Sequence, residues 1–138
     1  MVQYEKEFLL KIKNFNYFYF DFYLTIMVTN LSYLKNMTDG NPDLMQELIN
    51  IFISQADEYT REMQELHAQG DWQALSRLAH KAKSSVAIMG MTELSEMLKD
   101  LELFARDQKN VDKFPDYINK FTTEINIACK ELKTTKIK

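Results

Sequence analysis

The stretch "WQALSRLAHKAKSSVAIMG", residues 72–90, predicts a single helix with one buried face. Its apolar residues recur at steps of three and four positions, which keeps them on one side of a helix. Asp71 suits the cap before this helix, because its side chain can accept a hydrogen bond from a backbone N–H of the first turn. Gly90 suits the end of the helix. The expected core stripe consists of Trp72, Leu75, Ala79, Ala82, Val86 and Met89.

A second amphipathic helix is predicted before this stretch, between Asn41 and Gly70. Asn41 suits the cap, and Pro42 suits the first helical position because its missing N–H would be unpaired there in any case. Gly70 can adopt the left-handed conformation that ends a helix. The apolar residues expected on the buried face are Leu44, Leu48, Phe52, Tyr59, Met63 and Leu66.

Two more helices are predicted after Gly90. Thr92 is expected to cap the first, and Pro115 is tolerable in the second because it lies in the first turn. Their expected core residues are Leu94, Met97, Leu98, Leu101 and Phe104, and then Phe114, Tyr117, Ile118, Phe121, Ile125, Ala128 and Leu132. Short connections make neighbouring helices antiparallel. We therefore predict an all-α fold, an antiparallel up-down-up-down four-helix bundle with an additional short N-terminal helix at residues 29–37.

The composition excludes several classes of function. Three Gly and two Pro in 138 residues are too few for an all-β domain, and the length fits one domain. The net charge of -3 gives no reason to expect nucleic-acid binding. The single Cys129 excludes an internal disulfide framework, and no glycine-rich phosphate loop or metal-binding motif occurs. We expect a cytoplasmic protein without a nucleotide, cofactor or metal site of its own.

The aromatic stretch "FNYFYFDFYLTIM", residues 15–27, stands out from the remainder of the chain. It contains Asn16 and Asp21 and is shorter than the roughly 20 apolar residues that span a membrane, so no membrane span is expected. It also lacks the small-residue cleavage site of a secretory signal. Three interpretations stay open: an extra helix that packs on the domain or a partner, an interfacial or self-associating segment, and a translation start at Met27.

His80 is the residue of greatest chemical interest, because it follows the core residue Ala79 and so lies on the flank of its helix. The same face has no bulky side chain, which would let a large rigid partner approach a ring nitrogen closely. The residues on this face are Ser76, Lys83, Ser84 and Ala87. Arg77, Lys81 and Lys83 surround the imidazole with positive charge, which disfavours imidazolium and stabilises an incoming phosphoryl dianion.

The segment "AHKAKSSVAIMG", residues 79–90, resembles the phosphoacceptor motif of histidine phosphotransfer (HPt) domains. That motif runs as histidine, two residues, lysine, a small residue, a run of small residues and a closing glycine. The resemblance places His80 on the phosphoacceptor, Lys83 on the lysine and Ser84 on the small position, with Gly90 as the closing glycine. The surrounding segments that also resemble the family are residues 41–58, 70–80 and 94–102.

Two positions depart from the family pattern. Ser84 replaces the commoner glycine, and Ala82 replaces the commoner leucine; serine is still small, and its hydroxyl could donate to a phosphoryl oxygen. The resemblance covers residues 29–131. We divide the chain into an aromatic-rich N-terminal extension (1–28), an HPt four-helix bundle (29–133) and a basic C-terminal tail (134–138).

The resemblance implies a phosphocarrier that is not itself a kinase. His80 would accept a phosphoryl group from a receiver-domain phosphoaspartate and pass it to the aspartate of another receiver. Lys83 would steady the transferred oxygens, and Ser84 would permit close approach. The expected partners are response-regulator receiver domains and a hybrid sensor histidine kinase, with Mg²⁺ supplied by the receiver. The residues expected to contact a partner are Ser76, Arg77, Lys81, Ala87, Ile88 and Met91.

Two alternatives to a phosphocarrier stay open. The first is a helical docking or inhibitory module that binds receivers or kinases without carrying phosphate. The second is an unrelated structural helical domain in which the motif is a coincidence. Self-association through residues 15–27 is a further hypothesis that is compatible with each of these functions.

Overall fold

The structure is a computed structural model that describes residues 27–137. Residues 1–26 and 138 lie outside the described part of the chain, and so do the three interpretations of the aromatic stretch. Between residues 27 and 137 all regular structure is helical. Its elements are α2 (Ser32–Met37), α3 (Pro42–Gln69), α4 (Trp72–Ile88), α5 (Thr92–Asp107), the 3-10 turn η1 (Val111–Lys113) and α6 (Phe114–Thr134).

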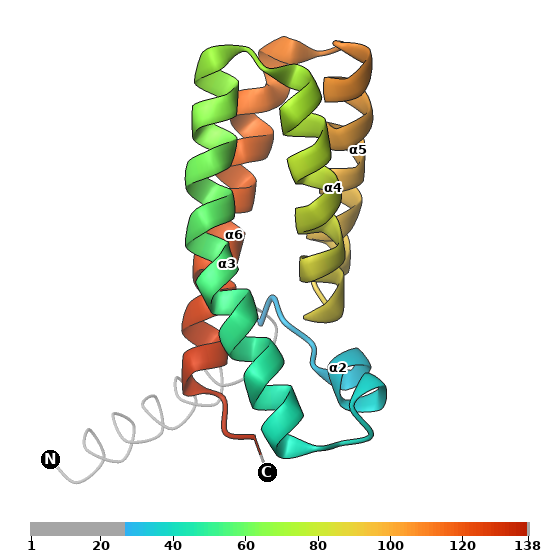
Figure 1. Cartoon of the computed structure of the whole chain (residues 1–138), viewed down its shortest axis with the longest axis vertical. Helices are drawn as coiled ribbons and strands as arrows, with labels where there is room; N and C mark the ends of the chain where they lie inside the picture. The colour runs from blue at the N-terminus through green and yellow to red at the C-terminus, as the bar shows by residue number, and fades with distance from the viewer. Residues whose placement is uncertain (1–26, 138) are drawn as a thin grey trace, which may run out of the picture.

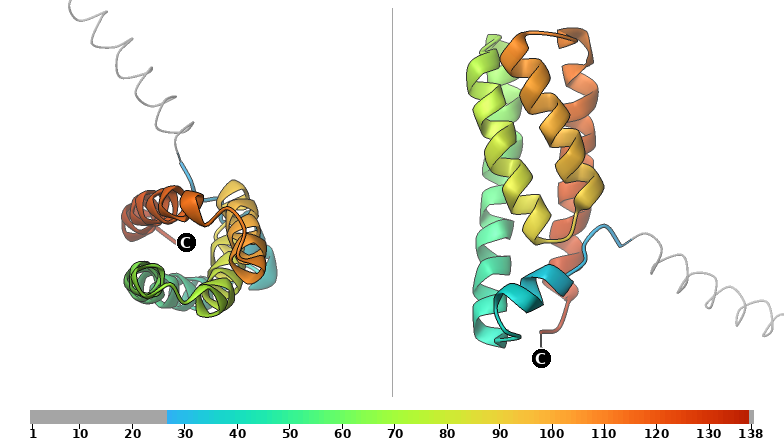
Figure 2. Two further views of the ribbon diagram at one scale, coloured as in Figure 1. Left: turned by 90° about the horizontal axis from the view of Figure 1, so that it is seen from above. Right: turned by 90° about the vertical axis from the view of Figure 1, so that its right-hand side faces the viewer.

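The four long helices, α3 to α6, run side by side and reverse direction at each connection (Figure 1). This arrangement confirms the predicted all-α, up-down-up-down bundle. Seen from above, the four helices surround one common core (Figure 2). The short predicted helix before the bundle is also present, as α2, and it lies beneath the end of α4 (Figure 1). No helix among the described residues has the length and apolar character needed to cross a membrane.

The helix ends explain why the chain folds in these segments. The side chain of Asn41 accepts hydrogen bonds from the first backbone N–H groups of α3, and Gly70 ends that helix in the left-handed conformation with a φ of 67°. Asp71 caps α4 by accepting from the N–H of Ala74 at 3.1 Å. The prediction for Thr92 is wrong: α5 is capped by Met91 without a side-chain bond, so Thr92 is already helical.

The core is apolar and continuous across the four long helices. The prediction for the start of α3 is one position out: Met45 and Ile49 are buried, whereas Leu44 is 40% exposed. Leu44 precedes Met45 by one residue and therefore points about 100° away from it around the helix. The largest fully buried side chains are Phe114, Phe121, Leu34, Ile49, Met63, Leu75, Met89, Leu94, Leu98, Leu101, Ile125 and Leu132.

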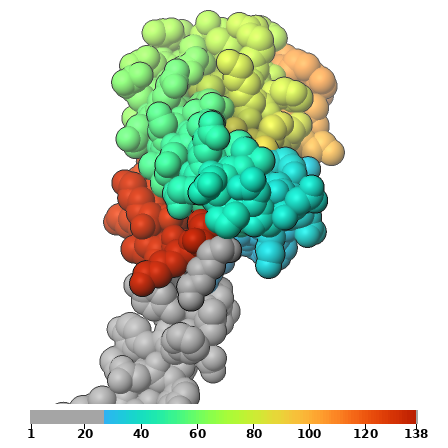
Figure 3. Space-filling model, turned by 60° about the horizontal axis from the view of Figure 1, so that its bottom comes forward, coloured from blue at the N-terminus to red at the C-terminus, as the bar shows by residue number. Residues whose placement is uncertain are grey.

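The segment before α2 joins two distant parts of the bundle. The Glu131 carboxylate of α6 accepts hydrogen bonds from the Val28 and Thr29 N–H groups and from the Thr29 hydroxyl, at 2.9, 3.2 and 2.8 Å. The N–H of the next residue, Asn30, donates to the Met89 carbonyl at 2.9 Å. The segment thereby attaches the chain just before α2 to α6 and to the α4–α5 turn. Figure 3 shows α2 and the start of α3 together at this end of the molecule.

Gly90 is required where this segment crosses the turn between α4 and α5. It has a φ of 74°, and a Cβ atom added there would lie 2.1 Å from the Asn30 carbonyl oxygen. Both its conformation and the lack of space around it exclude a side chain. The glycine that closes the motif therefore has a packing reason in this fold.

Candidate functional site

His80 lies near the middle of α4 and projects into solvent, with 61% of its side chain exposed. The opposite side of the helix is held in the core by Leu78, Ala79 and Ala82, which fixes the direction in which the imidazole points. The ring nitrogen Nδ1 lies 2.8 Å from Oε1 of Glu102, a residue of the neighbouring helix α5. The ring is therefore exposed to solvent and also oriented by a second helix.

Glu102 holds two residues of the motif at once. Its second oxygen, Oε2, accepts a hydrogen bond from the Lys83 ammonium at 2.9 Å. Burial alone would raise the pKa of Glu102, but the hydrogen bonds and positive charges of Lys83 and His80 outweigh burial, so that its pKa lies below the ordinary value. Glu102 is consequently an ionised carboxylate at neutral pH.

The ionised state of Glu102 determines which nitrogen of His80 is available. A carboxylate can only accept hydrogen bonds, so Nδ1 of the neutral ring must carry the proton and donate it to Glu102. Nε2 is then left with a free lone pair at the other side of the ring. A carboxylate behind an imidazole fixes the tautomer and the orientation of the ring, as it does for histidines that bind metals.

Hydroxyl groups fix the register between α4 and α5 around this carboxylate. The Ser76 hydroxyl donates to the backbone carbonyl of Glu102 at 2.8 Å. In return, the Ser95 hydroxyl of α5 donates to the backbone carbonyl of Lys83 at 3.2 Å. The two bonds join α4 and α5 at Glu102, which contacts His80, and at Lys83, which contacts Glu102. They limit sliding between the two helices.

The structure divides the residues predicted for partner contact into two groups. Arg77, Lys81, Ser84 and Ala87 are exposed on the same helix as His80, and Ile88 is half-buried at its end. Ser76 and Met91 are only 7% and 3% exposed, so the prediction that they meet a partner is wrong. The Ser76 hydroxyl is used inside the molecule, and Met91 is drawn into the core because it caps α5 at the tight α4–α5 turn.

Glu102 is the functional residue that sequence reasoning missed. The signal that could have found it is the register of an antiparallel helix pair. His80 and Glu102 each lie eleven residues from Met91, the cap between α4 and α5, so they come side by side when the chain folds back. Periodicity along a single helix carries no such information.

The other histidine, His67, has a structural role. It lies in the last turn of α3, where its ring packs 5.7 Å from that of Trp72. Among residues 27–137 no group of three or more histidine, cysteine, aspartate or glutamate side chains is placed to hold a metal ion. His80, Lys83 and Glu102 form a hydrogen-bonded cluster on the surface of α4 and α5.

Known proteins resemble the chain in sequence and in fold. Residues 47–134, more than half of the chain, match the family model described as "Hpt domain". The structure is similar to the crystal structure of histidine-containing phosphotransfer protein B (HptB) from Pseudomonas aeruginosa PAO1, with a TM-score of 0.69 and 26% sequence identity. The similarity covers 76% of this chain and 90% of that one. No curated protein matches the chain.

Proposed function

The chain belongs to the Hpt domain family, whose members transfer phosphoryl groups by way of histidine in phosphorelays, and from this premise we propose that His80 carries the phosphoryl group here. The observation that supports this assignment is the exposed imidazole whose Nδ1 is held by Glu102. The arrangement directs Nε2, the nitrogen with the free lone pair, toward an incoming partner. The phosphoryl group would come from the phosphoaspartate of a receiver domain.

The proposed reaction is an in-line displacement at phosphorus. The Nε2 lone pair of His80 forms the new P–N bond while the P–O bond to the receiver aspartate breaks, and that aspartate leaves as a carboxylate. The ring gains positive charge as the bond forms, and the ionised Glu102 stabilises it through Nδ1–H. The reverse displacement passes the group to the aspartate of a second receiver, so no proton has to leave Nδ1 in either direction.

Lys83 is proposed to stabilise the transferred oxygens. It follows His80 by three residues on α4, which places the two side chains on the same face of the helix. Its ammonium is held by Glu102 in the structure described, so its flexible side chain is already beside the ring and needs only a small change to meet a phosphoryl oxygen. Exposed Ser84 is the second residue proposed to meet these oxygens, through its hydroxyl.

The surface proposed to meet the partner combines small and basic residues around His80. Ser84 and Ala87 leave room beside the ring, and Arg77 and Lys81 supply positive charge for a receiver whose phosphorylation site is acidic. Phosphoryl transfer depends mainly on alignment and charge stabilisation, and we propose that the Mg²⁺ that stabilises charge comes with the receiver. The phosphoryl group is proposed to come ultimately from a hybrid sensor histidine kinase. The chain is then a carrier without kinase activity, and a cytoplasmic location is part of the proposal.

Transfer of labelled phosphate tests this function. A receiver domain charged with a labelled acyl phosphate is incubated with the full chain, and the label on the chain is measured. We expect an acid-labile, base-stable adduct that disappears in His80→Gln. The control is His67→Gln, which replaces the other histidine and should label like the wild type.

Two outcomes would contradict the proposal. Undiminished labelling of His80→Gln would show that another residue carries the phosphoryl group. Binding of the charged receiver without labelling of the wild type would identify a docking module in place of a carrier.

A further inference from the structure

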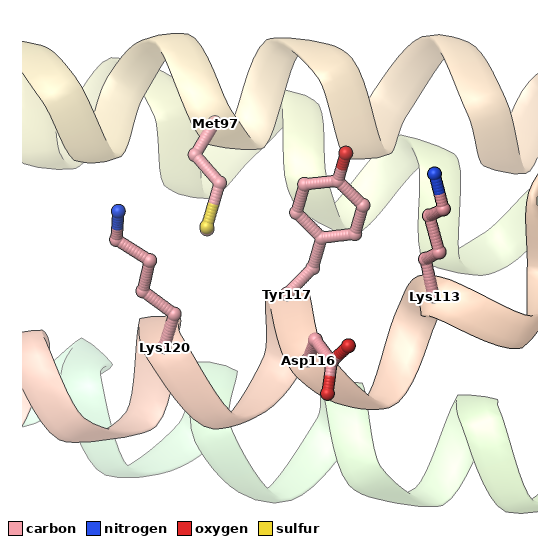
Figure 4. A pocket seen from close by; sticks show the side chains of 5 residues that line it. All are labelled: Met97, Lys113, Asp116, Tyr117 and Lys120. Carbon is pink, nitrogen blue, oxygen red and sulfur yellow. The ribbon is translucent and has the colours of Figure 1, made fainter.

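Among the neighbouring long helices of the bundle, α5 and α6 approach each other closely at the fewest positions, and a groove lies between them. One cavity in this groove has a volume of about 320 Å³ and lies between α5 and the first turns of α6 (Figure 4). A second cavity, of about 450 Å³, lies where α5 begins. The first is lined by Met97, Lys113, Asp116, Tyr117 and Lys120, and the second by Met27, Val28, residues 90–94 and Glu124.

The chemistry of the first cavity suits aromatic side chains. Tyr117 lies in its middle, with Lys113 and Lys120 on either side and Met97 facing it from α5 (Figure 4). Thioether sulfur packs favourably on aromatic rings, and ammonium groups are attracted to ring faces. Phe104 continues the apolar surface, since its ring lies 6.3 Å from that of Tyr117. An aromatic occupant would therefore find both apolar and cationic contacts.

The chain itself enters at one end of this groove. Met27, the first described residue, is 45% exposed and lines the second cavity. Its position is fixed, because the next two residues are hydrogen-bonded to Glu131. Whatever precedes Met27 in the sequence is therefore tethered at the mouth of the groove.

The residues that precede Met27 match the groove in composition and length. Seven of the twelve residues 15–26 are aromatic, and Asp21 is their single charged residue. Lys113 and Lys120 outnumber Asp116 in the first cavity, so Asp21 suits that part of the groove and not the second cavity, which Glu93 and Glu124 line. The groove runs along α6 from Glu124 to Lys113, or about 17 Å at 1.5 Å per residue. Twelve residues span about 18 Å even as a helix and more when extended, so the reach is sufficient.

From the position of this entry point and the nature of the groove, we propose that residues 15–26 bind in the α5–α6 groove of their own chain. The segment would pack on the half-buried ring of Tyr117, beside the buried Met97, and remove its own aromatic rings from water. The groove lies between α5 and α6, whereas His80 lies on α4, so the proposal goes beyond the phosphocarrier function and does not depend on it.

Paramagnetic NMR tests the proposal on the full chain. A nitroxide spin label is attached through Phe20→Cys in a Cys129→Ser background, and the methionine methyl groups are labelled with ¹³C. Binding in the groove predicts loss of the Met97 methyl signal, which returns when the nitroxide is reduced, and weaker broadening of Met63, whose helix α3 does not line the groove. The Met97 signal is assigned with Met97→Leu.

A second variant and a mixing experiment make the outcome decisive. In the full chain with ¹³C-labelled methionine methyl groups and no spin label, Phe18→Ser, Phe20→Ser and Phe22→Ser together should shift the Met97 methyl resonance, because they remove aromatic ring currents. The Met63 resonance should stay in place. A retained Met97 signal beside the spin label, or an unmoved Met97 resonance in the triple variant, would overturn the proposal. Loss of the signal when spin-labelled chains are mixed with separate ¹³C-labelled chains would also overturn it, since the segment would then bind a second copy.

Discussion

At the scale of single residues, the site depends on one carboxylate that serves two partners. Glu102 accepts from Nδ1 of His80 and from the Lys83 ammonium, and both contacts require it to be ionised. A glutamine in its place keeps the size of the side chain but has only one acceptor oxygen and no charge. Glu102 is therefore the position at which a conservative change should be most informative.

We predict that Glu102→Gln slows phosphoryl transfer to His80 by about tenfold or more, by analogy with the loss seen when the hydrogen-bond partner behind a metal-binding histidine is removed. The reason is the loss of negative charge behind a ring that becomes positive during the reaction. Single-turnover transfer from a charged receiver measures this rate. The matched control is Glu96→Gln, which makes the same chemical change at an exposed position of α5. Equal rates for wild type and Glu102→Gln would contradict the role given to this carboxylate.

The lowered pKa of Glu102 also predicts how stability depends on pH. In the unfolded chain Glu102 takes up its proton at a higher pH than in the folded one, so the unfolded state binds more protons as the pH falls. The stabilisation is present above the ordinary glutamate pKa, about 4.3, and is lost as the pH falls through the lower pKa of the folded state. Urea unfolding between neutral and acidic pH should show a smaller loss of free energy in Glu102→Gln than in the wild type. The same loss in both proteins would indicate that this pair makes no contribution.

At the scale of the elements, the α4–α5 pair carries the site, and its turn depends on Gly90. We predict that Gly90→Ala lowers the free energy of unfolding by about 3 kcal/mol, because it combines a left-handed backbone with a clash against the Asn30 carbonyl. Gly70→Ala is a matched control: its φ is 67°, but the nearest atom to an added Cβ is 3.8 Å away. It should cost only the conformational part, about 1 kcal/mol. Denaturant unfolding measures both, and equal losses would contradict the importance of the Asn30 contact.

Features set within one helix could be predicted from the sequence, whereas features set by the pairing of two helices could not. The ends of α3 and α4 were predictable because Asn41, Gly70 and Asp71 act on backbone groups a few residues away. His80 was predictable as an exposed residue because its exposure follows from the periodicity of one helix. Glu102 was not predicted, since its contacts depend on how two helices pair. The burial of Met91 escaped prediction for the same reason, because it follows from the turn between those helices.

At the scale of the whole molecule, the bundle gives His80 a rigid base, and residues 28–30, the segment before α2, pack across one end of the bundle. The segment connects α6 to the α4–α5 turn through Glu131 and Asn30. Parts of the chain that are far apart in sequence are thus held together by a few polar contacts at the surface. Such contacts open more readily than a buried core.

We predict that Glu131→Ala increases the amide hydrogen exchange of Val28 and Thr29 by about tenfold, which corresponds to loss of about 1.4 kcal/mol of local stabilisation. Amides in the middle of α4 should exchange as in the wild type, because the core does not depend on this contact. Hydrogen exchange followed by NMR gives both rates in one experiment. Unchanged exchange at Val28 and Thr29 would show that the carboxylate does not fix the segment.

The central claim is that Nε2 of His80 receives the phosphoryl group while Nδ1 keeps its proton and its bond to Glu102. Long-range ¹H–¹⁵N NMR of the ¹⁵N-labelled chain, recorded before and after phosphorylation by a charged receiver, measures the state of both ring nitrogens. We predict a phosphorylated Nε2 and a protonated Nδ1 on His80, with His67 unchanged. Phosphorus on Nδ1, or ring signals of His80 that stay the same while the chain is phosphorylated, would contradict the claim.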